Sequence, residues 1–123
     1  MRRLVVIESP LAGDFETNRR YALWCCLDST LRGEAPFASH VFYTQFLDDQ
    51  VQALRQTGIQ CGLSWGAVAE LRALYIDLGV TDGMRIGVES ARALGQDVEE
   101  RYLDPQFHER FLVGETPPCT RGF

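Results

Sequence analysis

The chain of 123 residues contains no lysine, so arginine supplies all 12 of its basic side chains, against 17 acidic ones. Without an amine side chain, Schiff-base chemistry, the Walker A phosphate loop and a lysine general base are excluded. Arginine can still bind phosphate or carboxylate through two parallel hydrogen bonds. The net charge of −5 argues against a protein that coats duplex nucleic acid, which needs clustered cations, but it is compatible with a small anionic ligand.

Metal-binding patterns and long apolar runs are also missing. The four cysteines form no CxxC motif, and His40 and His108 have no ligand spacing relative to them, so we expect no metal site. Cys25 and Cys26 lie in an apolar run that favours buried structural thiols. Neither a signal peptide nor an apolar run of about 18 residues is present, which predicts a cytoplasmic protein that does not interact with membranes.

The hydrophobic pattern predicts alternating strands and helices. Continuous apolar or aromatic runs predict strands at residues 4–7, 37–46, 73–76 and 98–103. Helices are predicted at 14–31, 48–71 and 83–94, with Asp14 and either Thr81 or Asp82 as N-caps. Glycines recur every four residues at 58, 62 and 66, which predicts close approach to the sheet or to another subunit.

This alternation predicts an α/β fold, specifically a flavodoxin-like three-layer sandwich with a mostly parallel sheet of four or five strands in the order 2-1-3-4. Residues 104–123 are expected to form a tail that packs on the body or on a neighbour, with its last residues loose. In such sheets a ligand binds beyond the carboxyl ends of the strands, beside strand 1. The candidate site is therefore expected in residues 8–14, 39–49 and 77–85.

Polar side chains lie in the first two of these segments. The loop of residues 8–14 offers backbone amides and a helix start to a phosphate, although an ordinary connection has the same pattern. His40 and Tyr43 bring an imidazole and a phenol to the end of the second predicted strand. His40 is equally expected as a structural histidine, and for Asp48 and Asp49 the sequence favours caps of the following helix over a role in binding.

The third segment offers a carboxylate and a helix start. Asp77 ends an apolar strand, where its charge must be solvated or paired. The next helix presents its first amides and Arg85 to an anionic group. The alternative is a surface Arg85 in an ion pair with Glu89, four residues further on.

Several segments resemble one protein family in order and spacing. They are Glu8-Ser9-Pro10 with Gly13-Asp14, the string from Gly33 to His40, Tyr43-Thr44-Gln45 with Leu47-Asp48-Asp49, Gly62 to Gly66, and Asp77-Leu78-Gly79 with Gly83-Met84. Over residues 4–103 the chain resembles an uncharacterised phage and actinobacterial branch of the nucleoside 2-deoxyribosyltransferase-like superfamily. The resemblance implies such a domain at residues 1–103, and a homodimer or higher homo-oligomer that uses no cofactor.

The resemblance also implies an activity: hydrolysis or transfer at the N-glycosidic bond of a small (deoxy)nucleoside or its monophosphate. The superfamily uses a glutamate nucleophile and a second carboxylate, which follows the usual two-carboxylate logic of glycoside cleavage. Its glutamate follows a Gly-Met or Gly-Thr pair, but here Gly83-Met84 is followed by Arg85, and Glu89 lies about one turn further on. The Asp-Leu-x-Trp pattern of some members reads Gly62-Leu63-Ser64-Trp65 here, without the aspartate.

These observations give the expected site residues. Glu89 or Asp77 is expected as the nucleophile or electrostatic stabiliser, and His40, Glu8 or Asp48 as the proton carrier. The expected substrate-binding residues are Glu8, Ser9, Pro10, Gly13, Asp14, Tyr43, Gln45, Asp48, Asp49, Gly83, Met84 and Arg85. The alternative is a nucleotide-binding module, a sensor or a sequestering protein, that has lost the chemistry. A receiver-like signalling domain is excluded because it needs an acidic pair after strand 1 and a lysine.

Overall fold

Four parallel strands form the centre of the molecule, in the order β2-β1-β3-β4. The computed structural model describes residues 1–118. Its strands are β1 (Leu4–Glu8), β2 (Ala35–Phe37), β3 (Leu71–Tyr75) and β4 (Asp97–Arg101). Its helices are α1 (Phe15–Leu31), α2 (Ser39–Tyr43), α3 (Gln52–Gly66), α4 (Asp82–Ala93) and α5 (Pro105–Leu112). The predicted α/β class and strand order are confirmed.

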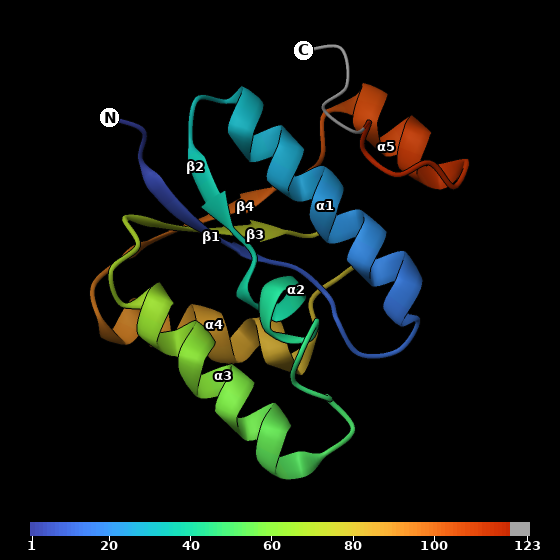
Figure 1. Ribbon diagram of the computed structural model, residues 1–123. Coiled ribbons are helices and arrows are strands. Elements are labelled where there is room, and N and C mark those ends of the chain that lie inside the picture. The colour runs from blue at the N-terminus through green and yellow to red at the C-terminus, as the bar shows by residue number, and fades with distance from the viewer. Residues whose placement is uncertain (119–123) are drawn as a thin grey trace.

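Helices cover both faces of this sheet, with α1 and α5 on one side and α3 and α4 on the other (Figure 1). Because side chains alternate along a strand, each strand contributes to both faces. Val5 and Ile7 of β1 pack in the larger apolar cluster with Trp24 of α1 and Phe111 of α5. The smaller cluster, on the opposite face, joins Leu74 of β3 to Met84 and Val88 of α4.

The prediction of a strand over residues 37–46 is wrong. The strand β2 ends at Phe37, and the next residues form the short helix α2. Phe42 of α2 and Phe46 of the turn that follows it meet edge to face, with 5.5 Å between ring centroids. The Thr44 hydroxyl donates to the His40 carbonyl at 2.6 Å. Aromatic residues favour strands in general, but here their spacing satisfies a helix.

The prediction of one helix over residues 48–71 is too long at both ends. Asp48 lies in a turn before α3, where its carboxylate accepts from the Gln50 N–H at 2.9 Å. At the other end, the Gln96 side chain donates to the carbonyls of Gly66 and Ala69 at 2.7 and 3.0 Å. The Gly66 carbonyl also accepts from the Ala69 N–H at 3.1 Å, and Gln96 adds a side-chain donor that stabilises the end of the helix at this point. The chain then enters β3 at Leu71.

The chain after β4 forms α5 and lies against α1, where Phe111 is 3% exposed. The Trp24 indole donates to the Glu115 carbonyl at 2.8 Å and adds a polar contact to this packing. The expectation of loose final residues concerns residues 119–123, which lie outside the described residues. Cys119 is one of them. Among the residues described, no helix is both long and apolar enough to cross a lipid bilayer.

Candidate functional site

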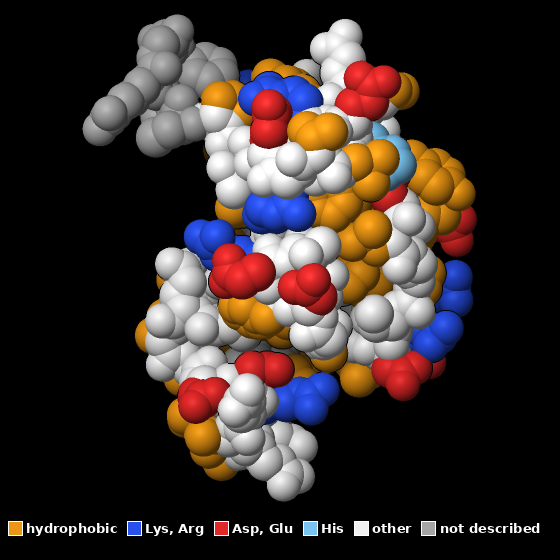
Figure 2. All heavy atoms as spheres, turned by 90° about the vertical axis from the view of Figure 1, so that its right-hand side faces the viewer, with side chains coloured by type: hydrophobic (Ala, Val, Ile, Leu, Met, Phe, Trp, Pro, Cys, Tyr) orange, Lys and Arg blue, Asp and Glu red, His pale blue; other side chains and the backbone are white. Residues whose placement is uncertain are grey.

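A cavity of about 400 Å³ lies at the carboxyl ends of β1 and β3, between α2, α3 and the start of α4. Figure 2 views the molecule from the side toward which β1, β3 and β4 run, and shows hydrophobic side chains gathered among acidic and basic ones. The polar lining residues are Glu8, Ser9, Ser39, His40, Tyr43, Thr44, Asp49, Arg55, Arg72, Thr81 and Asp82. The apolar ones include Leu11, Leu54, Ile59, Leu63, Met84 and Ile86. This size and mixed lining suit a small organic molecule.

Glu8 and Arg72 form a buried ion pair beside this cavity. Glu8 is the last residue of β1, and Arg72 lies in the adjacent strand β3. Arg72 Nη1 donates to Glu8 Oε1 at 3.2 Å and to the Gly87 carbonyl of α4 at 2.7 Å. The Arg72 side chain is 1% exposed and that of Glu8 is 16% exposed. The pair therefore lies between the sheet and the two helices on this face.

Two glycines make room for the pair. A Cβ at Gly87 of α4 would lie within 2.7 Å of all three terminal atoms of the Glu8 carboxyl group. A Cβ at Gly66 of α3 would collide with the Arg72 guanidinium. The next glycine of the predicted ladder, Gly62, faces Ser39 of α2, and its Cβ would be 2.7 Å from the Ser39 oxygen. The close approach that the ladder predicts therefore occurs within this chain.

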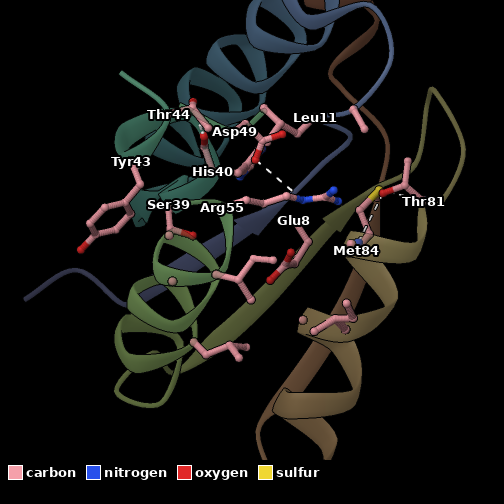
Figure 3. Close-up of a pocket in the computed structure, with 18 of the residues that line it drawn as sticks. Glu8, Leu11, Ser39, His40, Tyr43, Thr44, Asp49, Arg55, Thr81 and Met84 are labelled. Atoms are coloured by element: carbon pink, nitrogen blue, oxygen red, sulfur yellow. Dashed lines mark hydrogen bonds and ion pairs between the residues drawn. The ribbon is translucent and has the colours of Figure 1, made fainter. Parts of the chain in front are cut away.

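The position of Glu8 changes its acidity. Burial raises the pKa of Glu8 from 4.5 to about 7, and the positive charge and hydrogen bond of Arg72 only partly oppose this rise. A carboxyl group with this pKa exchanges its proton near neutral pH. Within residues 1–118, its second oxygen, Oε2, has no hydrogen-bond partner. Figure 3 shows the Glu8 side chain in the middle of the group of lining residues.

Ser9 and His40 form a second polar pair in the lining. The Ser9 oxygen and His40 Nε2 are 2.7 Å apart, which is a hydrogen bond between β1's end and α2. Burial lowers the pKa of His40 to about 4, so its imidazole is neutral at pH 7. A neutral imidazole accepts a proton more readily than it supplies one. Glu8 is therefore the better proton donor of the two.

Arg55 and Asp49 lie at the edge of the cavity. The Arg55 side chain points from α3 into the group of lining residues, and Asp49 faces it from the loop before α3 (Figure 3). Arg55 Nε and Asp49 Oδ1 are 3.9 Å apart, a loose contact between partly exposed side chains. At the opposite side, Thr81 caps α4 by accepting from the Met84 N–H at 3.3 Å. Because its contact with Asp49 is loose, the Arg55 guanidinium still has N–H donors that can bind an anionic group.

The Tyr43 side chain lies in the lining but its ring points away from the other lining residues (Figure 3). Its hydroxyl accepts from the Trp65 indole of α3 at 2.8 Å. Trp65 is 54% exposed and also stacks at a tilt on Phe37. Tyr43 therefore connects the cavity wall to an exposed aromatic group.

The structure places the expected substrate-binding residues in three locations. The main cavity is lined by Glu8, Ser9, Tyr43, Asp49, Gly83 and Met84, together with His40. A neighbouring hollow is lined by Gly13, Gln45 and Asp48, and also by Asp49. Pro10 is buried, and Asp14 caps α1 through the Thr17 N–H at 3.2 Å. Arg85 is exposed and pairs with Asp82 at 2.7 Å, so the predicted Arg85–Glu89 ion pair is wrong.

The two carboxylates expected to react with the sugar lie elsewhere. Asp77 accepts from the Tyr21 hydroxyl and from the Leu103 N–H, which places it against α1 and the segment before α5. Glu89 is exposed on α4. Neither is among the described residues that line the cavity. The structure does not bring them together with Glu8 and His40.

Arg72 and Arg55 are the charged cavity residues that lie outside the segments in which the sequence predicts the site. Arg72 is a charged residue between apolar neighbours, which is a usable signal once β3 is known to begin at Leu71. The predicted helix over residues 48–71 hid this signal. Arg55 has the spacing of an ordinary exposed helix residue, and only the tertiary structure places it beside Asp49.

A family model described as a domain of unknown function, DUF7768, matches residues 3–101. The matched range contains all four strands and every residue of the main cavity lining. The helix α5 follows it. No curated protein matches the chain.

Proposed function

We propose that this chain, which belongs to the DUF7768 family, binds a small (deoxy)nucleoside or its monophosphate and hydrolyses or transfers its N-glycosidic bond. The observation that carries the proposal is Glu8, a buried carboxyl group in the cavity lining whose pKa is about 7. The resemblance of the segments from Glu8 to Met84 to the nucleoside 2-deoxyribosyltransferase-like superfamily supports the same chemistry. The parallel sheet of order 2-1-3-4 is consistent with it.

The proposed reaction breaks the bond between C1′ of the sugar and a nitrogen of the base. The leaving nitrogen needs a proton, which the protonated Glu8 carboxyl group supplies as a general acid. The oxocarbenium-like sugar is then captured by water or, in a transfer reaction, by the nitrogen of a second base. The proton of the attacking water in hydrolysis, or the N–H proton of the incoming base in transfer, returns to a carboxylate, Glu8 or Asp49, so that the site regains its starting charge.

The lining offers separate places for the parts of such a ligand. The leucine and isoleucine side chains of α3 and α4 suit the flat apolar face of a base. Arg55 suits a 5′-phosphate because its guanidinium has only a 3.9 Å contact with Asp49 within the described chain. The neutral pair of Ser9 and His40 supplies a hydroxyl and a ring nitrogen for hydrogen bonds to the sugar.

A nucleotide-binding module without catalysis is the second candidate. The observation that favours it is the residue after Gly83-Met84, which is Arg85 where the superfamily has its glutamate. Glu89, the next carboxylate after Arg85 on that helix, is exposed and outside the cavity lining of the described chain. Binding alone needs no nucleophile, so the binding module would form no product, whereas the enzyme would release the free base.

The test incubates the purified full chain with each deoxynucleoside and deoxynucleoside monophosphate and follows free base by chromatography. We expect base release from at least one of them, and a loss of roughly 100-fold or more in Glu8→Gln. Glu89→Gln is the matched control, because this exposed carboxylate should leave the rate unchanged. Ligand-induced thermal stabilisation without base release would support the binding module. The absence of both base release and thermal stabilisation would refute both candidates.

A further inference from the structure

Arg72 is a buried charge whose hydrogen bonds are incomplete. Its Nη1 has two acceptors, Glu8 Oε1 and the Gly87 carbonyl. Its Nε and Nη2 are buried and have no partner within residues 1–118. Unpartnered buried donors reduce stability, and well-packed apolar residues often replace a buried ion pair without loss. The stability of the fold therefore does not explain why an arginine occupies this position.

The residues around Arg72 nevertheless leave the space that an arginine side chain needs. Gly66 of α3 and Gly87 of α4 leave the space that the guanidinium and the Glu8 carboxyl group fill. A methyl group at either glycine would contact one partner of the pair at less than 3 Å. Two helices on the same face thus lack a side chain at the positions where the pair lies.

We infer that Arg72 is a positioning residue for Glu8: it fixes the carboxyl group through Oε1 and leaves Oε2 without a hydrogen-bond partner within residues 1–118. The inference deepens the proposed function, on which the role of Glu8 as proton donor rests. The Gly87 carbonyl, 2.7 Å from Arg72 Nη1, is the second acceptor of the same nitrogen and fixes the guanidinium to α4. Arg72 itself acts through Glu8, since its nitrogens face Glu8, Gly87 and Gly66.

The electrostatics agree with this role. Arg72 lowers the pKa of Glu8, and burial, which raises it, is the larger effect. Without Arg72, the pKa of the carboxyl group would be higher still, so the group would stay protonated at neutral pH and would release its proton to the leaving base less readily. The charged or titratable groups that the other elements bring to the cavity are His40 and Tyr43 of α2, Asp49 of the following loop, Arg55 of α3 and Asp82 of α4. Of the two arginines that line the cavity, Arg55 and Arg72, the one in hydrogen-bond contact with Glu8 within residues 1–118 is Arg72.

The experiment titrates the side-chain carboxyl carbon of Glu8 by NMR in the full chain labelled with 13C-glutamate, the signal being assigned by its loss in Glu8→Gln. No substrate is present, so the result is independent of base release. We expect the midpoint in Arg72→Met to lie about one pH unit or more above that of the wild type. Arg85→Gln, which removes the same charge from an exposed position, should leave the midpoint unchanged. Equal midpoints in Arg72→Met and the wild type would overturn the inference.

Two further variants keep the test decisive. If Arg72→Met does not fold, Arg72→Lys keeps the charge but presents one nitrogen to two acceptors, so a smaller upward change is expected and an unchanged midpoint would overturn the inference. The double variant Glu8→Gln/Arg72→Met replaces the whole ion pair. We expect it to unfold at a temperature close to that of the wild type, and a large loss would show that the pair serves the fold instead.

Discussion

Glu8 shows at the scale of one residue how burial and a partner charge compete. Its carboxyl group is close to Arg72, which favours the charged form, and it is removed from water, which favours the neutral form. The removal from water is the larger effect, so the pKa rises. This balance has a consequence for stability that does not depend on any ligand.

Between pH 4.5 and about 7 the folded chain keeps a proton on Glu8 that the unfolded chain releases. The contribution of this group to the free energy of unfolding is therefore complete below pH 4.5 and falls by about 3 kcal/mol as the pH rises through 7. We expect urea unfolding to show the wild type losing stability relative to Glu8→Gln between pH 5 and pH 8. The same pH dependence in both proteins would contradict a raised pKa.

Single residues also explain why the site could be predicted only in part. Glu8, Ser9 and His40 stand at or close to the carboxyl ends of strands in the sequence, and the topology of a parallel sheet brings these ends together. Arg72 does not stand at a strand end. Its importance depends on Glu8, 64 residues away, and on Gly87, 15 residues away, and neither contact has a local signal.

At the scale of elements, α3 shows what its glycines do. Gly66 faces Arg72, whereas a Cβ at Gly58 would make ordinary contacts of 3.7 and 3.8 Å with Leu47 and Tyr43. The two glycines therefore provide a matched pair of positions in one helix, one in contact with the buried ion pair and one without such a restriction.

We expect Gly66→Ala to lower the free energy of unfolding by about 1–3 kcal/mol, because the methyl group displaces a buried guanidinium. Gly58→Ala should instead raise it by up to about 1 kcal/mol, through the better helix propensity of alanine. Urea denaturation of both variants measures the difference. Equal effects of the two substitutions on the free energy of unfolding would mean that the Arg72 side chain moves aside without a loss of stability.

The elements themselves were predictable where a local signal marks the boundary. Helix α1 has Asp14 as its N-cap, and α4 has Thr81, and both helices begin where these residues predict. Helix α2 was missed because its aromatic residues favour a strand by type and a helix by spacing. The end of α3 was missed because Gln96, which binds its last carbonyls, comes 30 residues after Gly66 in the sequence.

At the scale of the whole molecule, the cavity and the helix α5 lie on different parts of the sheet. The family match ends at residue 101, but Phe111 of α5 is part of the larger apolar cluster with Tyr21 and Trp24. The Arg20 guanidinium also lies over the Phe111 ring, 4.8 Å from its centroid. The segment after the matched range therefore completes the core.

Phe111→Ala should lower the free energy of unfolding by about 3–4 kcal/mol, as expected for a large ring removed from a core. Leu112→Ala, at the neighbouring position that is 66% exposed, should change it by less than about 1 kcal/mol. Thermal or urea unfolding gives both values. The Phe111 variant should keep its response to nucleotides at temperatures where it is folded, and loss of that response would connect α5 to the cavity.

The hydrogen bond from the Trp65 indole to the Tyr43 hydroxyl has a practical consequence. The chain has two tryptophans, and Trp24 is fully buried under α5 whereas Trp65 is half in water. Indole emission changes wavelength and intensity with hydration and with nearby dipoles. Trp65 is therefore an intrinsic fluorophore beside the cavity wall, and with Trp24 replaced by phenylalanine its spectrum alone would report whether a solute has entered.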